Sequence, residues 1–160
     1  MESAIRLPPR PGPPPLVSTR GRVEQVTRTA PVGLQRALLT LAAQLPGVIL
    51  GPTALCVPGT CAYLLSPALA RGPADAFMDG TEFGHAHPLY DGSQHLVLPT
   101  ALAEEVVQTG WGTHAEPDGS VLVYGPLDEE QLQTVWQLVL AAYHRAASGP
   151  PEDAEREGTR

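Results

Sequence analysis

Residues 82–98, EFGHAHPLYDGSQHLVL, decide the fold of this chain. Asp91, Gly92 and Ser93 in the middle of the stretch are typical turn residues, and they separate two runs that read as strands. The pattern predicts two strands, over 82–87 and 94–98, joined by a short loop. Because strands joined by so short a loop run in opposite directions, we expect an antiparallel sheet at the centre of the domain.

Outward from this hairpin, three stretches have the periodicity of helices. Residues 33–45 place leucines on one face and end at Pro46-Gly47. A second helix starts at Pro99 and Thr100 and closes at Gly110. A third follows the acidic triplet 128–130, which suits the positive end of a helix dipole. Its apolar face, interpreted as core, carries Leu132, Val135, Trp136, Val139, Leu140 and Tyr143.

Short apolar runs bounded by glycine and proline predict the remaining strands. They cover residues 48–50, 54–57, 60–65 and 120–124. Helices and strands in this order predict a single α+β domain, with an antiparallel sheet of about five to six strands and helices packed on one face.

The domain is expected to span residues 31–147. Residues 1–30 contain PPRPGPPP and few apolar groups, so we expect a disordered, proline-rich arm there, with 148–160 as a disordered tail. A proline-rich arm is a candidate docking segment for a protein partner. No signal peptide or membrane-spanning run is recognisable, and a net charge of −7 argues against nucleic-acid binding. A cytoplasmic location without a membrane partner is the expectation.

The histidines of the hairpin are the candidate site. Residues i and i+2 of a strand share a face, so His85 and His87 should project together with Phe83, and Glu82 should point to the opposite face. The returning strand can bring His95 within reach. Three imidazoles on one sheet face, His85, His87 and His95, are typical of a zinc or iron site with an open position.

Two other interpretations of the histidines stay open at this point. They can form ordinary hydrogen bonds in a partly buried strand, or bind a small-molecule ligand without a metal. Trp111 can line a pocket mouth or anchor a loop. Cys56 and Cys61 are interpreted as small core residues, since no second cysteine pair completes a zinc site.

The motifs together resemble the luciferase domain family of bacteria and fungi. The resemblance covers about residues 47–143 and rests on an E-x-x-H-x-H strand (Glu82, His85, His87), a G-x-x-x-H segment (Gly110, His114) and the last helix, which ends at Tyr143. It implies that His114 belongs to one candidate site with His85 and His87. We therefore expect a pocket formed by four histidines: His85, His87, His95 and His114.

Three functions are compatible with such a pocket. The leading hypothesis is a domain that binds a small ligand or a metal. The alternatives are a non-catalytic protein-interaction module and a metal-dependent hydrolase or oxygenase. Glu82 could then serve as a general base beside a metal-bound water, although strand parity favours a solvated carboxylate.

Overall fold

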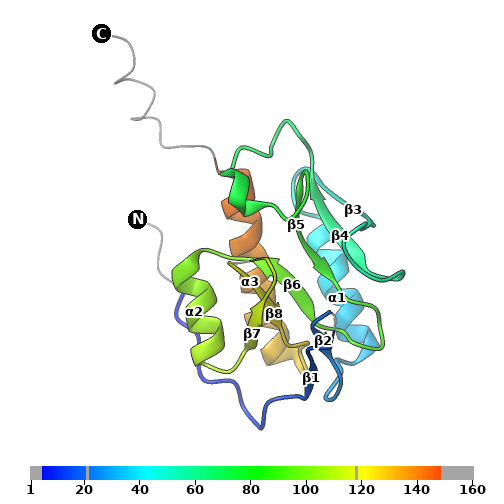
Figure 1. Ribbon diagram of the computed structural model, residues 1–160, viewed down its shortest axis with the longest axis vertical. Helices are drawn as coiled ribbons and strands as arrows, with labels where there is room; N and C mark the ends of the chain where they lie inside the picture. Colours follow the sequence, from blue (N-terminus) through cyan, green and yellow to red (C-terminus); the bar gives the residue numbers. More distant parts are fainter. Residues whose placement is uncertain (1–4, 21, 118, 149–160) are drawn as a thin grey trace.

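The structure, a computed structural model, describes residues 5–20, 22–117 and 119–148. Its centre is a six-stranded sheet in the order β3-β4-β5-β6-β8-β7, in which every neighbouring pair is antiparallel (Figure 1). The strands are β3 (Val48–Pro52), β4 (Cys61–Leu65), β5 (Glu82–Ala86), β6 (Gln94–Val97), β7 (Gly112–Ala115) and β8 (Ser120–Val123). The predicted single α+β domain with an antiparallel sheet is therefore confirmed.

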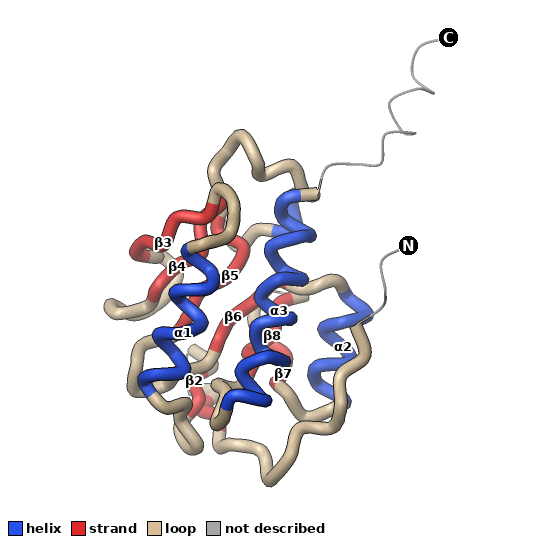
Figure 2. Tube along the Cα trace, turned by 180° about the vertical axis from the view of Figure 1, so that it is seen from behind, coloured by secondary structure: helices blue, strands red, loops and turns tan. Residues whose placement is uncertain are grey.

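The helices cover one face of this sheet (Figure 2). They are α1 (Val32–Ala43), α2 (Thr100–Gln108) and α3 (Glu129–Ala147), and a 3-10 turn, η1, covers Ala74–Ala76. The hydrophobic core lies between helices and sheet, and its largest fully buried side chains include Trp111, Tyr63, Phe83, Leu38, Leu96 and Leu138. No helix among the described residues is long and apolar enough to cross a membrane.

Helix α3 forms as its sequence predicts. Asp128 caps the helix by accepting a hydrogen bond from Gln131 N at 2.8 Å, which satisfies one of the free backbone donors of the first turn. Near the other end, the Tyr143 hydroxyl donates to the carbonyl oxygen of Pro46 at 2.8 Å. The Tyr143 ring packs edge-on against Phe83 with centroids 6.0 Å apart, so the apolar face of the helix belongs to the core.

Two strand predictions differ from the structure. Residues 54–57 belong to an irregular connection between β3 and β4, because the strand ends at Pro52 and the chain must turn before Cys61. Strand β7 was not predicted, since its four residues, GTHA, lack an apolar run. It pairs only with β8 and so forms one edge of the sheet.

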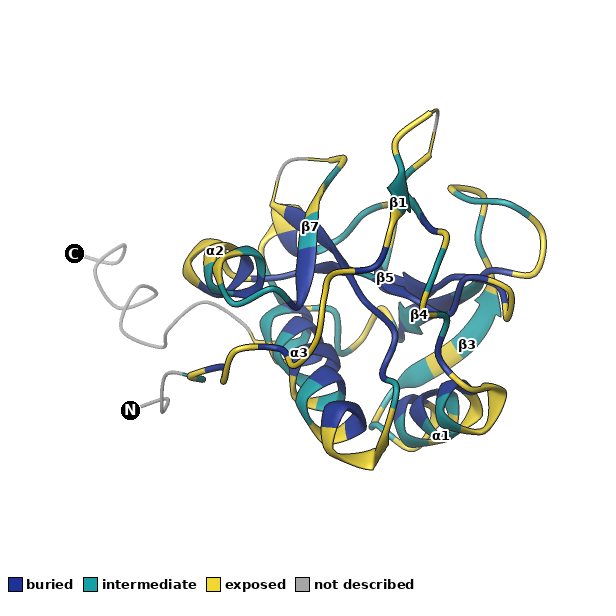
Figure 3. Cartoon of the chain, turned by 90° about the horizontal axis from the view of Figure 1, so that it is seen from below, coloured by how far each residue is buried: buried dark blue, intermediate teal, exposed yellow. Residues whose placement is uncertain are grey.

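The N-terminal segment, residues 5–20 and 22–30, lies against the domain. We expected it to be disordered, but Leu7 is buried in the core and the Trp111 indole donates to the carbonyl oxygen of Pro8 at 2.6 Å. Its short hairpin, β1 (Val17–Ser18) and β2 (Glu24–Gln25), lies across the sheet from α1 and α3 (Figure 3). Prolines lack the N–H but keep the carbonyl acceptor, so such a segment can still be held by donors of the domain. The predicted disorder of 1–4 and 149–160 falls outside the described residues.

Candidate functional site

A β-bulge in β5 decides which side chains reach the site. Tyr63 on β4 pairs with Gly84, and the next residue, Leu64, pairs with Glu82, so Phe83 has no partner opposite it. The extra residue reverses the side-chain alternation. Phe83 is fully buried in the core, and Glu82 turns toward His85. The expectation that Phe83 shares the face of His85, with Glu82 on the other face, is therefore wrong.

The structure brings three of the predicted histidines together. His85 and His95 are direct cross-strand partners with ring centroids 4.9 Å apart. His87 follows β5, and its ring centroid lies 5.2 Å from that of His85 and 6.2 Å from that of His95. All three rings line one pocket of about 490 Å³.

His85 is held by a buried carboxylate. Its Nδ1 lies 3.2 Å from Glu82 Oε1, and the second oxygen of Glu82 accepts a hydrogen bond from the Thr53 hydroxyl at 3.1 Å. A carboxylate only accepts, so in the neutral ring Nδ1 carries the hydrogen and Nε2 carries the lone pair. That Nε2 is buried and has no hydrogen-bond partner within the described part of the chain.

His87 is oriented in a similar way from the loop that follows it. Its Nδ1 lies 2.9 Å from Ser93 Oγ and 3.2 Å from Asp91 Oδ2. Because the Ser93 hydroxyl donates to Asp91, it can only accept from His87, and Nε2 of His87 is again the ring atom with the lone pair. Burial opposes ionisation of Asp91, but hydrogen bonds from His87 and Ser93 outweigh it, so the pKa of Asp91 is lowered.

His95 is kept neutral. Its Nε2 lies 2.9 Å from Ser120 Oγ, and that hydroxyl donates to the carbonyl oxygen of Pro117 at 2.6 Å. Ser120 therefore accepts from His95, and the hydrogen of the ring sits on Nε2. Burial, and then repulsion by the protonated forms of His85 and His87, lowers the pKa of His95 to about 3.

Cys56 completes a cluster that sequence reasoning missed. It lies in the connection between β3 and β4 and lines the pocket rather than the core. Its Sγ and one nitrogen each of His85 and His87 all lie within 4.8 Å of one another. The interpretation of Cys56 as a small core residue is therefore wrong. The β4–β5 register, which carries this connection toward the histidines, could not be derived from the sequence.

A comparison of the sequence with protein-family models found a match, and the matched residues include most of this site. Residues 80–142 match the family model of the luciferase domain. The matched segment begins just before β5 and ends within α3, so it contains Glu82 and all three pocket histidines. Cys56 lies before the segment. A comparison with curated proteins and one with solved structures each found no match.

Two residues that the sequence predicted for the site, His114 and Trp111, lie outside the pocket. His114 on β7 pairs with Val121, a core residue, so it points away from the pocket face. Its side chain is 56% exposed and lies 3.6 Å from Glu104 of α2. Trp111 is buried and anchors Pro8, so it is a loop anchor and not a pocket residue. The resemblance implied that His114 joins His85 and His87, and the geometry of the sheet separates them.

The remaining walls of the pocket are mostly apolar. They come from the N-terminal segment, from the connection that carries Cys56, from the stretch before β5, and from β7, β8 and the loop between them: Val23, Leu55, Met78, Ala115, Pro117 and Leu122. Arg22 and Glu116 add one charge of each sign. A pocket of this size and composition fits a small organic molecule with an apolar body.

Proposed function

We propose that Cys56, His85 and His87 bind one transition-metal ion and that the adjoining pocket holds a small-molecule ligand of that ion. The observation that carries the proposal is the buried, unpartnered Nε2 of His85. A buried polar atom without a partner costs about 1–3 kcal/mol, and a metal bond at this position would remove that cost.

The surroundings of the two imidazoles support a metal. Histidines that bind metals usually donate their other N–H to a carboxylate or carbonyl oxygen, which fixes the ring and raises its basicity. Glu82 does this for His85, and Asp91 with Ser93 does it for His87.

One thiolate and two imidazoles are a donor set that suits zinc, and iron is the second candidate. Metal–ligand bonds of about 2.0–2.3 Å place tetrahedral ligand atoms about 3.3–3.8 Å apart. The three ligand atoms here all lie within 4.8 Å of one another, so each separation must close by up to about 1.5 Å on binding. Cys56 lies in an irregular connection, which is the part able to supply that movement.

Three protein ligands leave one coordination position for water or a ligand. Zinc lowers the pKa of bound water to about 7, so hydrolysis of a small molecule is the reaction class that such a site supports best.

The test is metal binding by the untagged full chain. We expect one equivalent of Zn²⁺ or Co²⁺ to bind the chelator-treated protein, and zinc to raise its melting temperature by mass action. Cys56→Ser should weaken binding at least 100-fold, while Cys61→Ser, a matched change at the other free cysteine, should not. Absence of binding, or binding that Cys56→Ser leaves intact, would overturn the proposal.

A second function uses Cys56 and His85 without a metal. Cys56, His85 and Glu82 are in the order of a thiol nucleophile, a base and an orienting carboxylate. If the protein binds no metal, alkylation decides this second function. It requires iodoacetamide to modify Cys56 much faster than Cys61, and His85→Asn to abolish the difference. Equal rates at the two cysteines would exclude it.

A further inference from the structure

We infer that Gln25, in the N-terminal segment, is a positioning residue for His87 and acts through Asp91. The inference rests on the proposed metal site, because His87 is one of its ligands. It gives a role in the site to a segment that the sequence marks only as a proline-rich arm.

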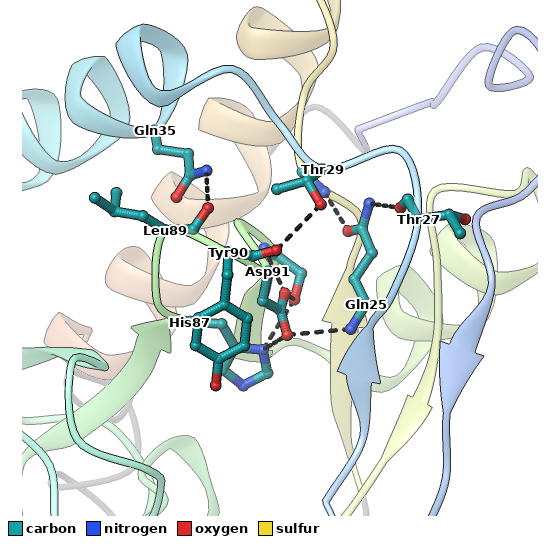
Figure 4. A network of polar contacts seen from close by, with 10 residues as sticks. Gln25, Thr27, Thr29, Gln35, His87, Leu89, Tyr90 and Asp91 are labelled. Carbon is teal, nitrogen blue, oxygen red and sulfur yellow. Dashed lines mark hydrogen bonds and ion pairs between the residues drawn. The ribbon is translucent and has the colours of Figure 1, made fainter.

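One contact between the N-terminal segment and the loop that follows His87 is made on the carboxylate of Asp91 (Figure 4). The backbone N–H of Gln25 donates to Asp91 Oδ2 at 3.1 Å, and the same oxygen lies 3.2 Å from Nδ1 of His87. The other oxygen, Oδ1, accepts from the backbone and the hydroxyl of Ser93. Gln25 is therefore the donor that fixes the oxygen facing His87.

The side chain of Gln25 holds its own backbone in place. Its Oε1 accepts a hydrogen bond from Gly125 N at 2.9 Å, and its Nε2 donates to the carbonyl oxygens of Thr27 and Arg28 at 3.0 and 2.9 Å. The residue is only 2% exposed. Its backbone N–H and both polar atoms of its side chain are hydrogen-bonded, and the bond from Gly125 N fixes the position of the Gln25 N–H relative to the domain that carries Asp91.

The approach of the segments at this point is unusually close. A Cβ placed on Gly125 would lie 2.6 Å from the carbonyl oxygen of Gly92 and 2.8 Å from the Cβ of Ala30. The end of β8, the loop after His87 and the N-terminal segment thus meet without room for a side chain. This close packing leaves the Asp91 carboxylate little freedom to move away from His87.

A second buried glutamine provides a matched control. Gln35 on α1 donates from its Nε2 to the carbonyl oxygens of Leu89 and Ala30 at 3.0 and 2.8 Å, so it ties the same loop to the N-terminal segment. Within the described part of the chain, its side chain makes no hydrogen bond with the Asp91 carboxylate. A role in stability alone would therefore be shared by Gln25 and Gln35, and a role in positioning would belong to Gln25.

The experiment compares Gln25→Leu and Gln35→Leu in the full chain, with Co²⁺ as the probe. Gln25→Leu keeps the N–H that bonds Asp91 but removes the side-chain bonds that position it. We expect a weaker Co²⁺ affinity, by at most the 10- to 100-fold that loss of the outer partner Asp91 itself would cause, and a changed visible spectrum of the bound ion. For Gln35→Leu we expect lower thermal stability, with affinity within about 3-fold of wild type and an unchanged spectrum. Asp91→Asn should weaken binding, and adding Gln25→Leu to it should cause little further loss.

The outcomes separate this inference from the proposed function. If wild type binds no Co²⁺, the proposed function fails and the inference falls with it. If wild type binds Co²⁺ through Cys56 and Gln25→Leu leaves affinity and spectrum unchanged, the metal site stands and the inference is overturned. Equal losses in the two leucine variants would also overturn it. Should Gln25→Leu not fold, Gln25→Asn replaces it, because that shorter amide cannot reach Gly125 N.

Discussion

Glu82 Oε1 lies 3.2 Å from His85 Nδ1, although the two residues are three positions apart on one strand. In a regular strand such residues point to opposite faces. The bulge at Phe83 brings them to the same face, and both side chains are almost fully buried. A single extra residue in β5 thus pairs a carboxylate with an imidazole at the pocket.

The first prediction removes the charge of this pair while keeping its shape. Glu82→Gln should weaken zinc binding about 10- to 100-fold, because a neutral amide raises the basicity of His85 less than a carboxylate does. Isothermal titration of the chelator-treated protein measures the change. Glu104→Gln is the matched control, since Glu104 pairs with His114 at an exposed position outside the pocket. The zinc affinity of this variant should equal that of wild type. Equal effects of the two substitutions would contradict the prediction.

The second prediction concerns the close packing beside the bulge. A Cβ on Gly84 would lie 2.8 Å from Leu96 Cδ2 and 2.9 Å from the carbonyl oxygen of His95, so the backbone of β6 would have to move. We expect Gly84→Ala to lower the free energy of unfolding by about 1–3 kcal/mol. Gly33→Ala on α1 meets no atom within 4 Å and should be neutral or stabilising by up to about 1 kcal/mol. Urea unfolding of both variants checks the contrast, and a neutral Gly84→Ala would refute it.

The sequence predicted the parts of the fold that depend on local patterns. Helix α3 and the strand pair β5–β6 follow from apolar spacing and turn residues, and both are present. The bulge at Phe83 has no local signature, so strand parity put Glu82 on the wrong face. Cys56 was missed for a related reason, because a cysteine in an irregular connection joins a site only through the register of the strands that flank it.

The third prediction tests how firmly the N-terminal segment is held. Trp111→Phe removes the indole donor to Pro8 and should cost about 1 kcal/mol of stability. The amide of Leu7 donates to Glu105 Oε1, and the amide of Arg10 donates to the carbonyl oxygen of Thr109. Both amides should exchange faster with solvent in the variant. Hydrogen exchange followed by mass spectrometry measures both, with the amides of β8 as the internal reference. Rapid exchange of Leu7 and Arg10 already in wild type would show that the segment is not held.

The last prediction follows from the lowered pKa of His95. The folded protein takes up a proton on His95 at about pH 3, whereas the unfolded chain does so near the ordinary value of 6.5. Between these values the unfolded state binds more protons, so this contribution to stability is complete above pH 6.5 and is lost as the pH falls toward 3. The slope contributed by one such group is at most about 1.4 kcal/mol per pH unit.

His95→Gln isolates this contribution. Its free energy of unfolding at pH 7.5 should be lower than that of wild type, because the bond to Ser120 is weakened, but it should decrease less steeply between pH 6.5 and 3. Urea unfolding of metal-free protein over this pH range gives both curves. For His114→Gln, a change at an exposed position, the curve of unfolding free energy against pH should run parallel to that of wild type. Asp91 is present in all three proteins, so its own acid titration does not produce a difference between their stability curves. Parallel curves for His95→Gln and wild type would contradict the prediction, because they would mean that His95 accepts its proton in the folded state as easily as in the unfolded chain.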